Sequence, residues 1–390
     1  MQKDFMKIAV ISAYQTKFGE FWDRSLSDLI AEAIFETVKG SKINLKQVQS
    51  IFIGNMLSSL TSDQNHLTSL VSEIIGLNIP ILRVEAACAS GGMAVASACQ
   101  SIESGLYDNA LVIGAEKMTD LSPESIAFAL MSAASEEERN CGLTFPGLYA
   151  LMARKYFAEF GANEKDLALV SIKNHYHASL NNKSQLPFEI SLKQVMDSSP
   201  VADPLKLLDC SPISDGAAGL LLCSQNFAKK YAPDNKVFIT ASAVATDTLN
   251  LSKRKKLTEI KSTKIAAKKA YAQAGLKSSD VNLAEIHDCF SIAEILAVED
   301  LGFCKKGEGY LFEKNGATKL GGKLPVNLSG GLKACGHPIG ATGVKQIVEL
   351  FNQMNNLCRG RQCPIANIGL AQNIGGTGGT AVIHILQKFL

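Results

Sequence analysis

The chain has 390 residues, of which 46% are hydrophobic and 19% are charged, and its formal net charge is +2. A chain of this length suits two or three packed units, and no apolar run approaches the roughly 18 residues that a membrane-spanning helix needs. The charge balance also lacks the concentrated basic surface that nucleic acids require, so we expect neither a membrane protein nor a nucleic-acid-binding protein.

The N-terminus and the cysteines indicate the compartment. The opening residues, MQKDFMKIAV, lack the long apolar core and the small-residue cleavage site of a signal peptide. The ten cysteines show no CxxC spacing, and a chain this long does not need disulfides to fold. The sequence therefore predicts a cytoplasmic protein with reduced thiols.

The predicted elements form two similar series along the chain. In the first series, a strand within 7–19 leads into a helix that begins with a capping box at Ser25 and Asp28 and ends at Gly40. The series continues with a strand at 45–55, a helix at 88–105, a strand at 109–116 and a glycine-led strand at 215–224. The counterparts in the second series lie at 236–247, 258–274, 278–288, 336–351, 365–370 and 375–386. This alternation predicts an α/β fold of two similar halves, with parallel sheets and right-handed crossovers.

One segment, 119–200, has no counterpart in the second series. We interpret it as an inserted loop domain that covers a site between the halves, since open α/β sheets bind ligands in crevices at the carboxyl ends of their strands. The predicted organisation is a first half at 1–118 and 201–233, the insertion at 119–200, and a second half at 234–390.

Reactive side chains occupy corresponding loops of the two halves. Cys88 opens a helix, where unpaired N–H groups and the helix dipole favour a thiolate. His287 and Cys289 end a strand, and in an extended chain they share one face. His337 lies before a helix in a glycine-rich segment, where it could act as a base toward a nearby thiol.

Two further segments suggest binding groups. The glycine run NIGGTGG at 373–379 offers free backbone N–H groups for an oxyanion. The basic run SKRKK at 252–256 includes Lys253, Arg254 and Lys255. This run is either a solvated surface or a docking site for a phosphorylated ligand or another chain.

Several of these motifs together resemble those of the thiolases. The segments CASGG, HDCF, GHPIGATG, DGAAG and NIGGTGG are similar to the branch that contains the SCP2-type and archaeal thiolases, and the resemblance spans nearly the whole chain. It implies a five-layered αβαβα core, an inserted loop domain that binds coenzyme A, and a homodimer or homotetramer. It also implies acyl transfer between coenzyme A thioesters, by condensation of two acetyl-CoA molecules or by cleavage of a 3-ketoacyl-CoA, with no cofactor besides these substrates. The archaeal branch works beside a hydroxymethylglutaryl-CoA synthase, which suggests such a partner.

The resemblance also implies roles for single residues. Cys88 would accept the acyl group, and His337 would activate it. His337 and His287 would form one oxyanion hole, and the backbone N–H groups of Cys88 and Gly375 would form a second. Ser211 matches the serine that contacts pantetheine. The basic run at 252–256 would bind the phosphates of coenzyme A, which carry several negative charges.

One position departs from the family pattern. Conventional thiolases carry a second catalytic cysteine where this chain has Asn373, and asparagine is not a Brønsted base. Cys289 could supply the missing acid/base thiol from the face that it shares with His287. Cys335, two residues before His337, is the rival candidate.

Two other interpretations compete with a thiolase. Cys335, His337, His287 and Cys289 could form a four-ligand zinc site, although such short spacings are unusual for structural zinc. The protein could also be a thiolase-like scaffold or binding subunit without catalysis, because Asn373 replaces the expected cysteine.

Overall fold

The computed structural model describes residues 6–389, in which nine strands form one large sheet and two more form a separate hairpin. The strands of the large sheet, in spatial order, are β3 (Ile81–Val84), β2 (Ile51–Gly54), β4 (Asn109–Glu116), β7 (Gly216–Cys223), β1 (Ile8–Gln15), β8 (Val237–Thr246), β11 (Thr380–Lys388), β10 (Ile368–Gly375) and β9 (Leu283–Glu285). The hairpin consists of β5 (Pro200–Ala202) and β6 (Leu205–Lys206).

The helices follow the same two series. Those of the first half and of residues 119–200 are α1 (Leu26–Lys39), α2 (Ser58–Thr61), α3 (Leu67–Ile75), α4 (Ser90–Glu103), α5 (Pro123–Leu130), α6 (Glu136–Asn140), α7 (Phe145–Phe160), α8 (Glu164–Ser179), α9 (Leu192–Asp197) and α10 (Gln225–Tyr231). Those of the second half are α11 (Lys261–Ala274), α12 (Ser291–Asp300), α13 (Gly309–Lys314), α14 (Gly331–Cys335) and α15 (Ile339–Met354).

The sheet is mixed, which corrects the expectation of parallel sheets. Within it, β2 runs parallel to β3 and to β4, and β9 runs parallel to β10. The other neighbouring strands run antiparallel. The tight glycine-rich turn after Gly375 returns the chain directly from β10 into β11, so this connection is a hairpin and not a crossover. The opening strands of the two halves, β1 and β8, pair antiparallel and join the half-sheets.

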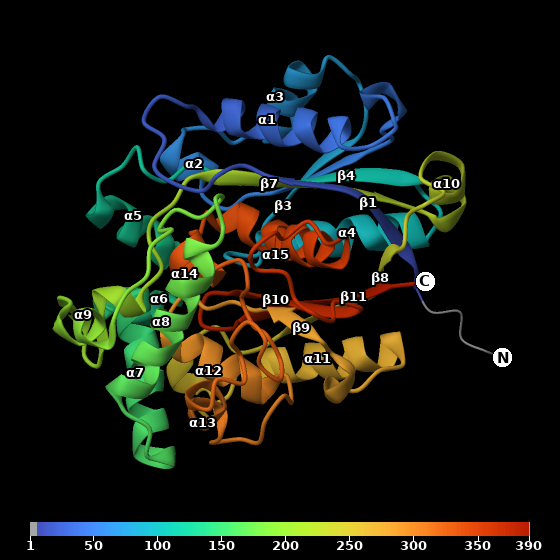
Figure 1. Cartoon of the computed structure of the whole chain (residues 1–390). Coiled ribbons are helices and arrows are strands. Elements are labelled where there is room, and N and C mark those ends of the chain that lie inside the picture. Colours follow the sequence, from blue (N-terminus) through green and yellow to red (C-terminus); the bar gives the residue numbers. More distant parts are fainter. Residues whose placement is uncertain (1–5, 390) are drawn as a thin grey trace.

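Figure 1 shows the layers of the predicted αβαβα core. Helices α1 and α3 cover the outer face of the first half-sheet, and α11 and α12 cover the outer face of the second. Helices α4 and α15 lie between the half-sheets and contact strands of both. The predicted five-layered αβαβα arrangement of two similar halves is therefore confirmed.

The middle layer brings the beginnings of α4 and α15 together. A Cβ atom at Gly91 in α4 would lie 2.5 Å from the carbonyl oxygen of Gly340 in α15, closer than real Cβ contacts come. A Cβ atom at Gly340 would in turn lie 2.5 Å from the carbonyl oxygen of Ala115 in β4. These glycines permit backbone contact between layers. The segments that carry Cys88 and His337 therefore start from neighbouring points in space.

Helix boundaries follow local capping. Ser25 and Asp28 form the predicted capping box of α1, and Gly40 is its C-cap. Helix α11 begins at Lys261, three residues later than Thr258, because the N–H of Ile260 just before it donates to the carboxylate of Asp300 at 2.7 Å.

Residues 119–200 are mainly helical, and α8 packs against α12, α13 and α14 of the second half. This contact buries titratable side chains, because buried Lys173 pairs with Glu294 and lies 3.7 Å from Glu313, whose pKa burial raises to about 8. Asn174 donates to the carboxylates of Asp288 and Glu294 at 2.7 and 2.8 Å. We call these five residues the buried charge cluster. In the described residues, no helix is both long and apolar enough to cross a membrane.

Candidate active site

Cys88 lies in the turn that leads into α4. Ala87, directly before it, has a left-handed backbone with φ of 52°, a conformation that costs a non-glycine residue about 1–2 kcal/mol. Ser90 holds this turn, since its Oγ accepts a hydrogen bond from the N–H of Ala86 at 3.0 Å and donates to the carbonyl of Ala87 at 2.6 Å. The strained turn is thus stabilised by a side chain of the helix that it precedes.

His287 lies outside the strand in which the sequence placed it. Strand β9 ends at Glu285, and residues 286–289 form an irregular segment before α12. Alternation along a strand is therefore not what orients His287 and Cys289. The N–H of His287 donates to Oε1 of Gln372 at 2.8 Å, and the N–H of Ser211 donates to the carbonyl of Cys289 at 2.9 Å. Neighbouring segments therefore hold the backbone of this loop.

His337 lies two residues before α15 and is held on both sides. Its backbone N–H donates to Oγ of Ser214 at 2.9 Å, and its ring Nδ1 lies 2.7 Å from Oγ1 of Thr342. The hydroxyl of Thr342 donates its single proton to the carbonyl of Pro338 at 3.0 Å. Nδ1 of His337 must therefore donate to Thr342, which leaves the lone pair of the neutral ring on Nε2.

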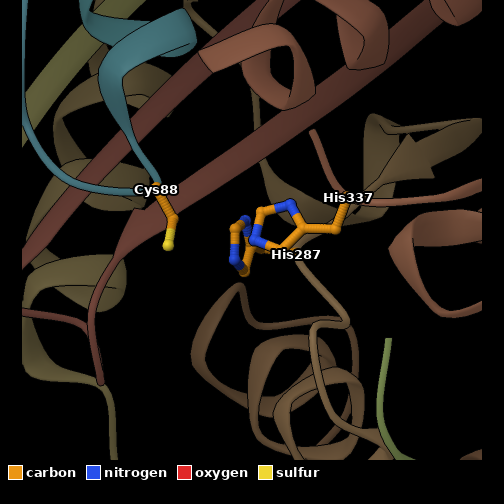
Figure 2. Close-up of side chains that lie close together, drawn as sticks. All are labelled: Cys88, His287 and His337. Atoms are coloured by element: carbon orange, nitrogen blue, oxygen red, sulfur yellow. The ribbon is translucent and has the colours of Figure 1, made fainter. Parts of the chain in front are cut away.

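Cys88, His287 and His337 converge, as Figure 2 shows. One ligand-type atom from each of the three side chains lies within 4.8 Å of the others. The two imidazole rings meet edge to face with their centroids 5.0 Å apart. The structure thus brings a thiol from the first half together with two imidazoles from the second.

All three groups are uncharged in the resting site. Burial raises the pKa of the Cys88 thiol to about 12, although the backbone N–H of Gly376 opposes this effect. Burial also lowers the pKa of His337 to about 3 and that of His287 well below its usual value. Desolvation therefore outweighs the helix N-terminus, and the thiol is the resting form of Cys88 in place of the expected thiolate.

A mostly apolar pocket of about 200 Å³ opens onto Cys88 and His337. Cys289 and Ser211 line it together with Gly376. Helices α5 and α7 and the turn before α7 supply much of its wall, through Pro123, Ala127, Leu130, Thr144, Phe145, Pro146 and Tyr149. Residues 119–200 therefore contribute to the pocket as well as packing on the second half.

The two candidates for the second thiol occupy different surroundings. Cys289 lines the pocket beside Tyr149, whose ring stacks on Phe290 with centroids 4.6 Å apart. Burial raises the pKa of the Cys289 thiol well above its usual value, and a hydrogen bond with Tyr149 opposes this. Cys335 instead packs with Phe18 and Ala341 and is not among the residues that line the pocket.

The four residues of the zinc interpretation do not come together. Within residues 6–389, the only metal-like group of three or more side chains is Cys88, His287 and His337, and it contains neither Cys335 nor Cys289. One thiol and two imidazoles are ligands that a zinc ion accepts. The pocket beside them has mostly apolar walls.

The remaining predicted binding residues differ in their relation to the pocket. Gly376, and not Gly375, lines the pocket beside Cys88. In the basic run, Arg254 donates to the carbonyl of Thr377 and, at 2.9 Å, to its hydroxyl, and Lys253 pairs with Glu137 at 2.9 Å.

Lys255 of the same run is exposed. The intramolecular contacts of Arg254 attach this run to the glycine-rich turn that contains Gly376.

Sequence reasoning missed three residues that support the site. Thr342 is visible in the motif GHPIGATG, but its contact with the ring of His337 depends on how the helix begins. Tyr149 belongs to a helix of the insertion, and no pattern marked it as facing the pocket. Asn373 was noticed only as a missing cysteine, although its amide contacts both Cys88 and His287.

Two family models cover most of the chain. The model described as the thiolase N-terminal domain matches residues 8–226, and the model described as thiolase C-terminal domain-like matches residues 243–388.

Individual proteins are similar over nearly the whole chain. The chain is 47% identical over 382 residues to an acetyl-CoA acetyltransferase of Methanothermobacter thermautotrophicus, with coverage of 98% of this chain and 99% of that protein. It is 32% identical over 400 residues to sterol carrier protein 2 of Oryctolagus cuniculus, with coverage of 98% of this chain and 72% of that protein. A solved structure of an Ltp2-ChsH2(DUF35) aldolase matches with a TM-score of 0.83 at 22% identity, covering 98% of each chain, and this likeness concerns the fold.

Proposed function

Because the chain belongs to the thiolase family, we propose that it is an acetyl-CoA acetyltransferase that condenses two acetyl-CoA molecules into acetoacetyl-CoA and free CoA, or runs this reaction in reverse. The observation that carries the proposal is the convergence of Cys88 with His287 and His337 at one end of an apolar pocket that also contains Cys289. The similarity to an archaeal acetyl-CoA acetyltransferase supports the choice of substrate.

In the first half-reaction, Cys88 becomes acetylated. Nε2 of His337 accepts the proton of the Cys88 thiol while the sulfur attacks the thioester carbonyl carbon of acetyl-CoA. The backbone N–H groups of Cys88 and Gly376 hold the oxyanion. When the tetrahedral intermediate collapses, the C–S bond to CoA breaks and Cys289 protonates the departing CoA thiolate. Acetyl-Cys88, a Cys289 thiolate and a His337 imidazolium remain.

In the second half-reaction, a carbon–carbon bond forms. The Cys289 thiolate removes an α-proton from a second acetyl-CoA, and the N–H groups of His287 and His337 hold the enolate oxygen. The enolate carbon attacks the acetyl-Cys88 carbonyl. Cys88 leaves as a thiolate and takes back the proton from His337, so acetoacetyl-CoA departs and every group returns to its resting form.

The sequence-based assignments of substrate binding fit this arrangement. Ser211 lines the pocket and would contact the pantetheine arm. The basic run at 252–256, of which Lys255 remains exposed, would face the phosphates of CoA. Residues 119–200 would act as the loop domain that closes the pocket, since seven of its lining residues come from that segment.

The proposal extends to assembly and location. We place the protein in the cytoplasm as a homodimer or homotetramer, with a hydroxymethylglutaryl-CoA synthase as a possible partner enzyme. Strand β3 supports an oligomer, because it is an edge strand of the described sheet and its Leu82 is 45% exposed. Exposed sheet edges tend to pair with another chain.

A burst experiment tests the reaction. Protein mixed with acetyl-CoA should release one equivalent of CoA per active site, and peptide mass mapping should place the acetyl group on Cys88. Acetylation at Cys289 with none at Cys88 would reverse the two assignments. A protein that releases no CoA and acquires no acetyl group would be the scaffold subunit of the alternative interpretation.

A further inference from the structure

Asn373, at the end of β10, joins three parts of the site through one side-chain amide. Its Oδ1 accepts a hydrogen bond from the N–H of Gly92 in α4 at 3.0 Å. Its Nδ2 lies 2.9 Å from the carbonyl oxygen of Cys88 and 3.1 Å from Nδ1 of His287. The side chain is 1% exposed, so water does not compete for these contacts.

Two independent contacts determine the orientation of this amide. The N–H of Gly92 can only donate a hydrogen bond, so the atom that faces it must be the amide oxygen. The carbonyl of Cys88 can only accept, so the atom that faces it must be the amide nitrogen. Both contacts therefore select the same orientation, and the two hydrogens of Nδ2 point at the Cys88 carbonyl and at the ring of His287.

This orientation determines the tautomer of His287. Because Asn373 donates to Nδ1, that nitrogen must carry the lone pair of the ring. A neutral imidazole then has its only proton on Nε2. The ring is fully buried, and burial together with nearby His337 holds its pKa well below the usual value, so it remains neutral.

The proton on Nε2 has no partner within the protein. Nε2 of His287 is a buried ring nitrogen that makes no hydrogen bond among the described residues. Unpartnered buried donors are rare and need an explanation. The ring lies against Cys88 and His337, where an oxygen atom of a substrate would supply the missing acceptor.

We propose that Asn373 is a positioning residue that fixes His287 as the Nε2–H tautomer, so that the ring presents a hydrogen-bond donor to the oxygen of a bound thioester or its enolate. The tautomer itself follows from the contacts of Asn373. The identity of the oxygen rests on the proposed function.

The two histidines are thereby held in opposite states. Thr342 accepts a hydrogen bond from Nδ1 of His337, so Nε2 of that ring is a base. Asn373 donates to Nδ1 of His287, so Nε2 of that ring is a donor. Two chemically identical neutral side chains, with centroids 5.0 Å apart, therefore begin the reaction with a proton acceptor at Nε2 of His337 and a hydrogen-bond donor at Nε2 of His287.

The surroundings accommodate asparagine at this position. A Cβ atom at Gly92 would lie 2.9 Å from Oδ1 of Asn373, and a Cβ atom at Gly343 would clash with the same oxygen. Two glycines from α4 and α15 thus leave the space that the amide fills. Aspartate has no amide hydrogens to donate, and cysteine offers a single thiol proton, so neither residue could make the three contacts.

Ring nitrogen NMR on the wild-type protein tests the tautomer directly. The chain has six histidines, so ¹⁵N-labelled histidine gives a small set of signals, and the His287→Gln variant identifies those of His287. We expect a bare Nδ1 and a protonated Nε2 in the substrate-free protein at neutral pH. A proton on Nδ1 with a bare Nε2 would overturn the proposal, and this result needs neither a variant at Asn373 nor any enzymatic activity.

The Asn373→Asp variant reverses the polarity at Nδ1. It keeps an acceptor for Gly92 but cannot donate to His287, so Nδ1 should become protonated. If Nε2 loses its proton, α-proton exchange of acetyl-CoA should fall about 10²–10³-fold, the usual effect of one lost oxyanion donor. The CoA burst from Cys88 should fall much less. A variant that keeps Nδ1 bare, or that loses the Nε2 proton without slower exchange, would contradict the proposal.

Asn181 offers a matched control. Its buried amide also accepts from a backbone N–H, that of Lys183 at 3.1 Å, and donates to a backbone carbonyl, that of Ser329 at 2.8 Å, with no contact to His287. Asn181→Asp should disturb local hydrogen bonding to a similar extent while leaving the ring signals of His287 unchanged. Movement of those signals in the control would assign the effect to general loosening of the fold and would count against Asn373. Absence of a CoA burst in the wild type would reject the proposed function and leave the tautomer measurement valid.

Discussion

The pocket at Cys88 and the buried charge cluster meet at one short loop and differ in how their buried polar groups are partnered. His287 and Cys289 face the pocket region, where burial favours uncharged groups. Asp288, between them, belongs to the cluster, where burial raises the pKa of its carboxyl to about 7, and it accepts hydrogen bonds from the N–H groups of Leu332 and Lys333 at 2.6 and 3.2 Å. Burial without a counter-charge keeps the reactive groups neutral, whereas hydrogen bonds from two backbone N–H groups and an amide let the buried Asp288 carboxyl anchor the backbone.

The largest expected effect comes from removing Cys88, the proposed nucleophile. Cys88→Ala should lower steady-state activity by a factor on the order of 10⁵–10⁶, as loss of a covalent nucleophile does in other enzymes. Its free energy of unfolding should change little, because the thiol is only partly buried and lines the pocket at the edge of a small apolar cluster. Steady-state rates and urea unfolding measure the two effects. Retained activity would show that acyl transfer does not pass through Cys88.

The second test separates the two half-reactions. Cys289→Ala should still form acetyl-Cys88 and release one equivalent of CoA, although more slowly, because CoA can leave as a thiolate without the proton from Cys289. It should lose α-proton exchange and condensation by about 10²–10⁴-fold, because a positioned general base contributes about that much. Cys335→Ala is the matched comparison, since Cys335 packs with Phe18 outside the pocket, and this variant should remain active. The reverse pattern would move the acid/base role to Cys335.

The third test addresses the charged side of the loop. Asp288→Ala leaves the N–H groups of Leu332 and Lys333 and the amide of Asn174 without their acceptor. Each unsatisfied buried group costs about 1–3 kcal/mol, so we expect a loss of about 3 kcal/mol in the free energy of unfolding, measured with urea.

An exposed aspartate provides the control for this loss. Asp197→Ala breaks an exposed ion pair with Lys193 and should change stability by less than about 1 kcal/mol. If both substitutions lower the free energy of unfolding equally, Asp288 does not anchor the loop.

Substitutions in the basic run test whether its charge contributes to the binding of acetyl-CoA. Lys255→Ala should raise KM for acetyl-CoA a few-fold at low salt and leave kcat unchanged, because an exposed charge attracts anions without touching the reacting atoms. Arg254→Ala should lower stability as well, since its guanidinium holds Thr377. If KM is unchanged at low salt for Lys255→Ala, the run is a solvated surface.

The smallest expected effect concerns the pH dependence of the CoA burst, in which we expect no change near pH 6.5. Because burial lowers the pKa of His337 to about 3, its Nε2 remains unprotonated and able to act as a base down to well below pH 6.5, where an exposed histidine titrates. The rate of the CoA burst should therefore show no acid limb near pH 6.5 while the protein stays folded. An apparent pKa near 6.5 in that profile would mean that water reaches His337.

Most of the elements could be predicted from the sequence, and so could three candidate residues, Cys88, His287 and His337, that the fold brings together. The capping box at Ser25, the duplicated order of strands and helices, and the small-residue helix after Cys88 are local patterns, and local patterns report on local backbone structure. Cys88, His287, Cys289 and His337 became candidates because they are rare side chains at a helix start, after a short strand and in a glycine-rich segment.

The tertiary structure determines the relative directions of the strands and the pKa values of the site residues. The antiparallel course of β7 and β11 depends on the path of the returning chain, which alternation along the sequence does not contain. The pKa values of Cys88 and His337 depend on how completely other segments exclude water from them. A helix N-terminus suggested a thiolate, and burial reversed that expectation.

Asn373 shows this division most clearly. From the sequence alone it is an asparagine where the resembled family has a cysteine, and that comparison establishes that it is not an acid or a base. Only the fold brings Gly92, the Cys88 carbonyl and the ring of His287 around one amide. The chemical type of each residue is local and is determined by the sequence, whereas the direction in which a hydrogen bond is donated depends on partners that are 86 to 285 positions away along the chain.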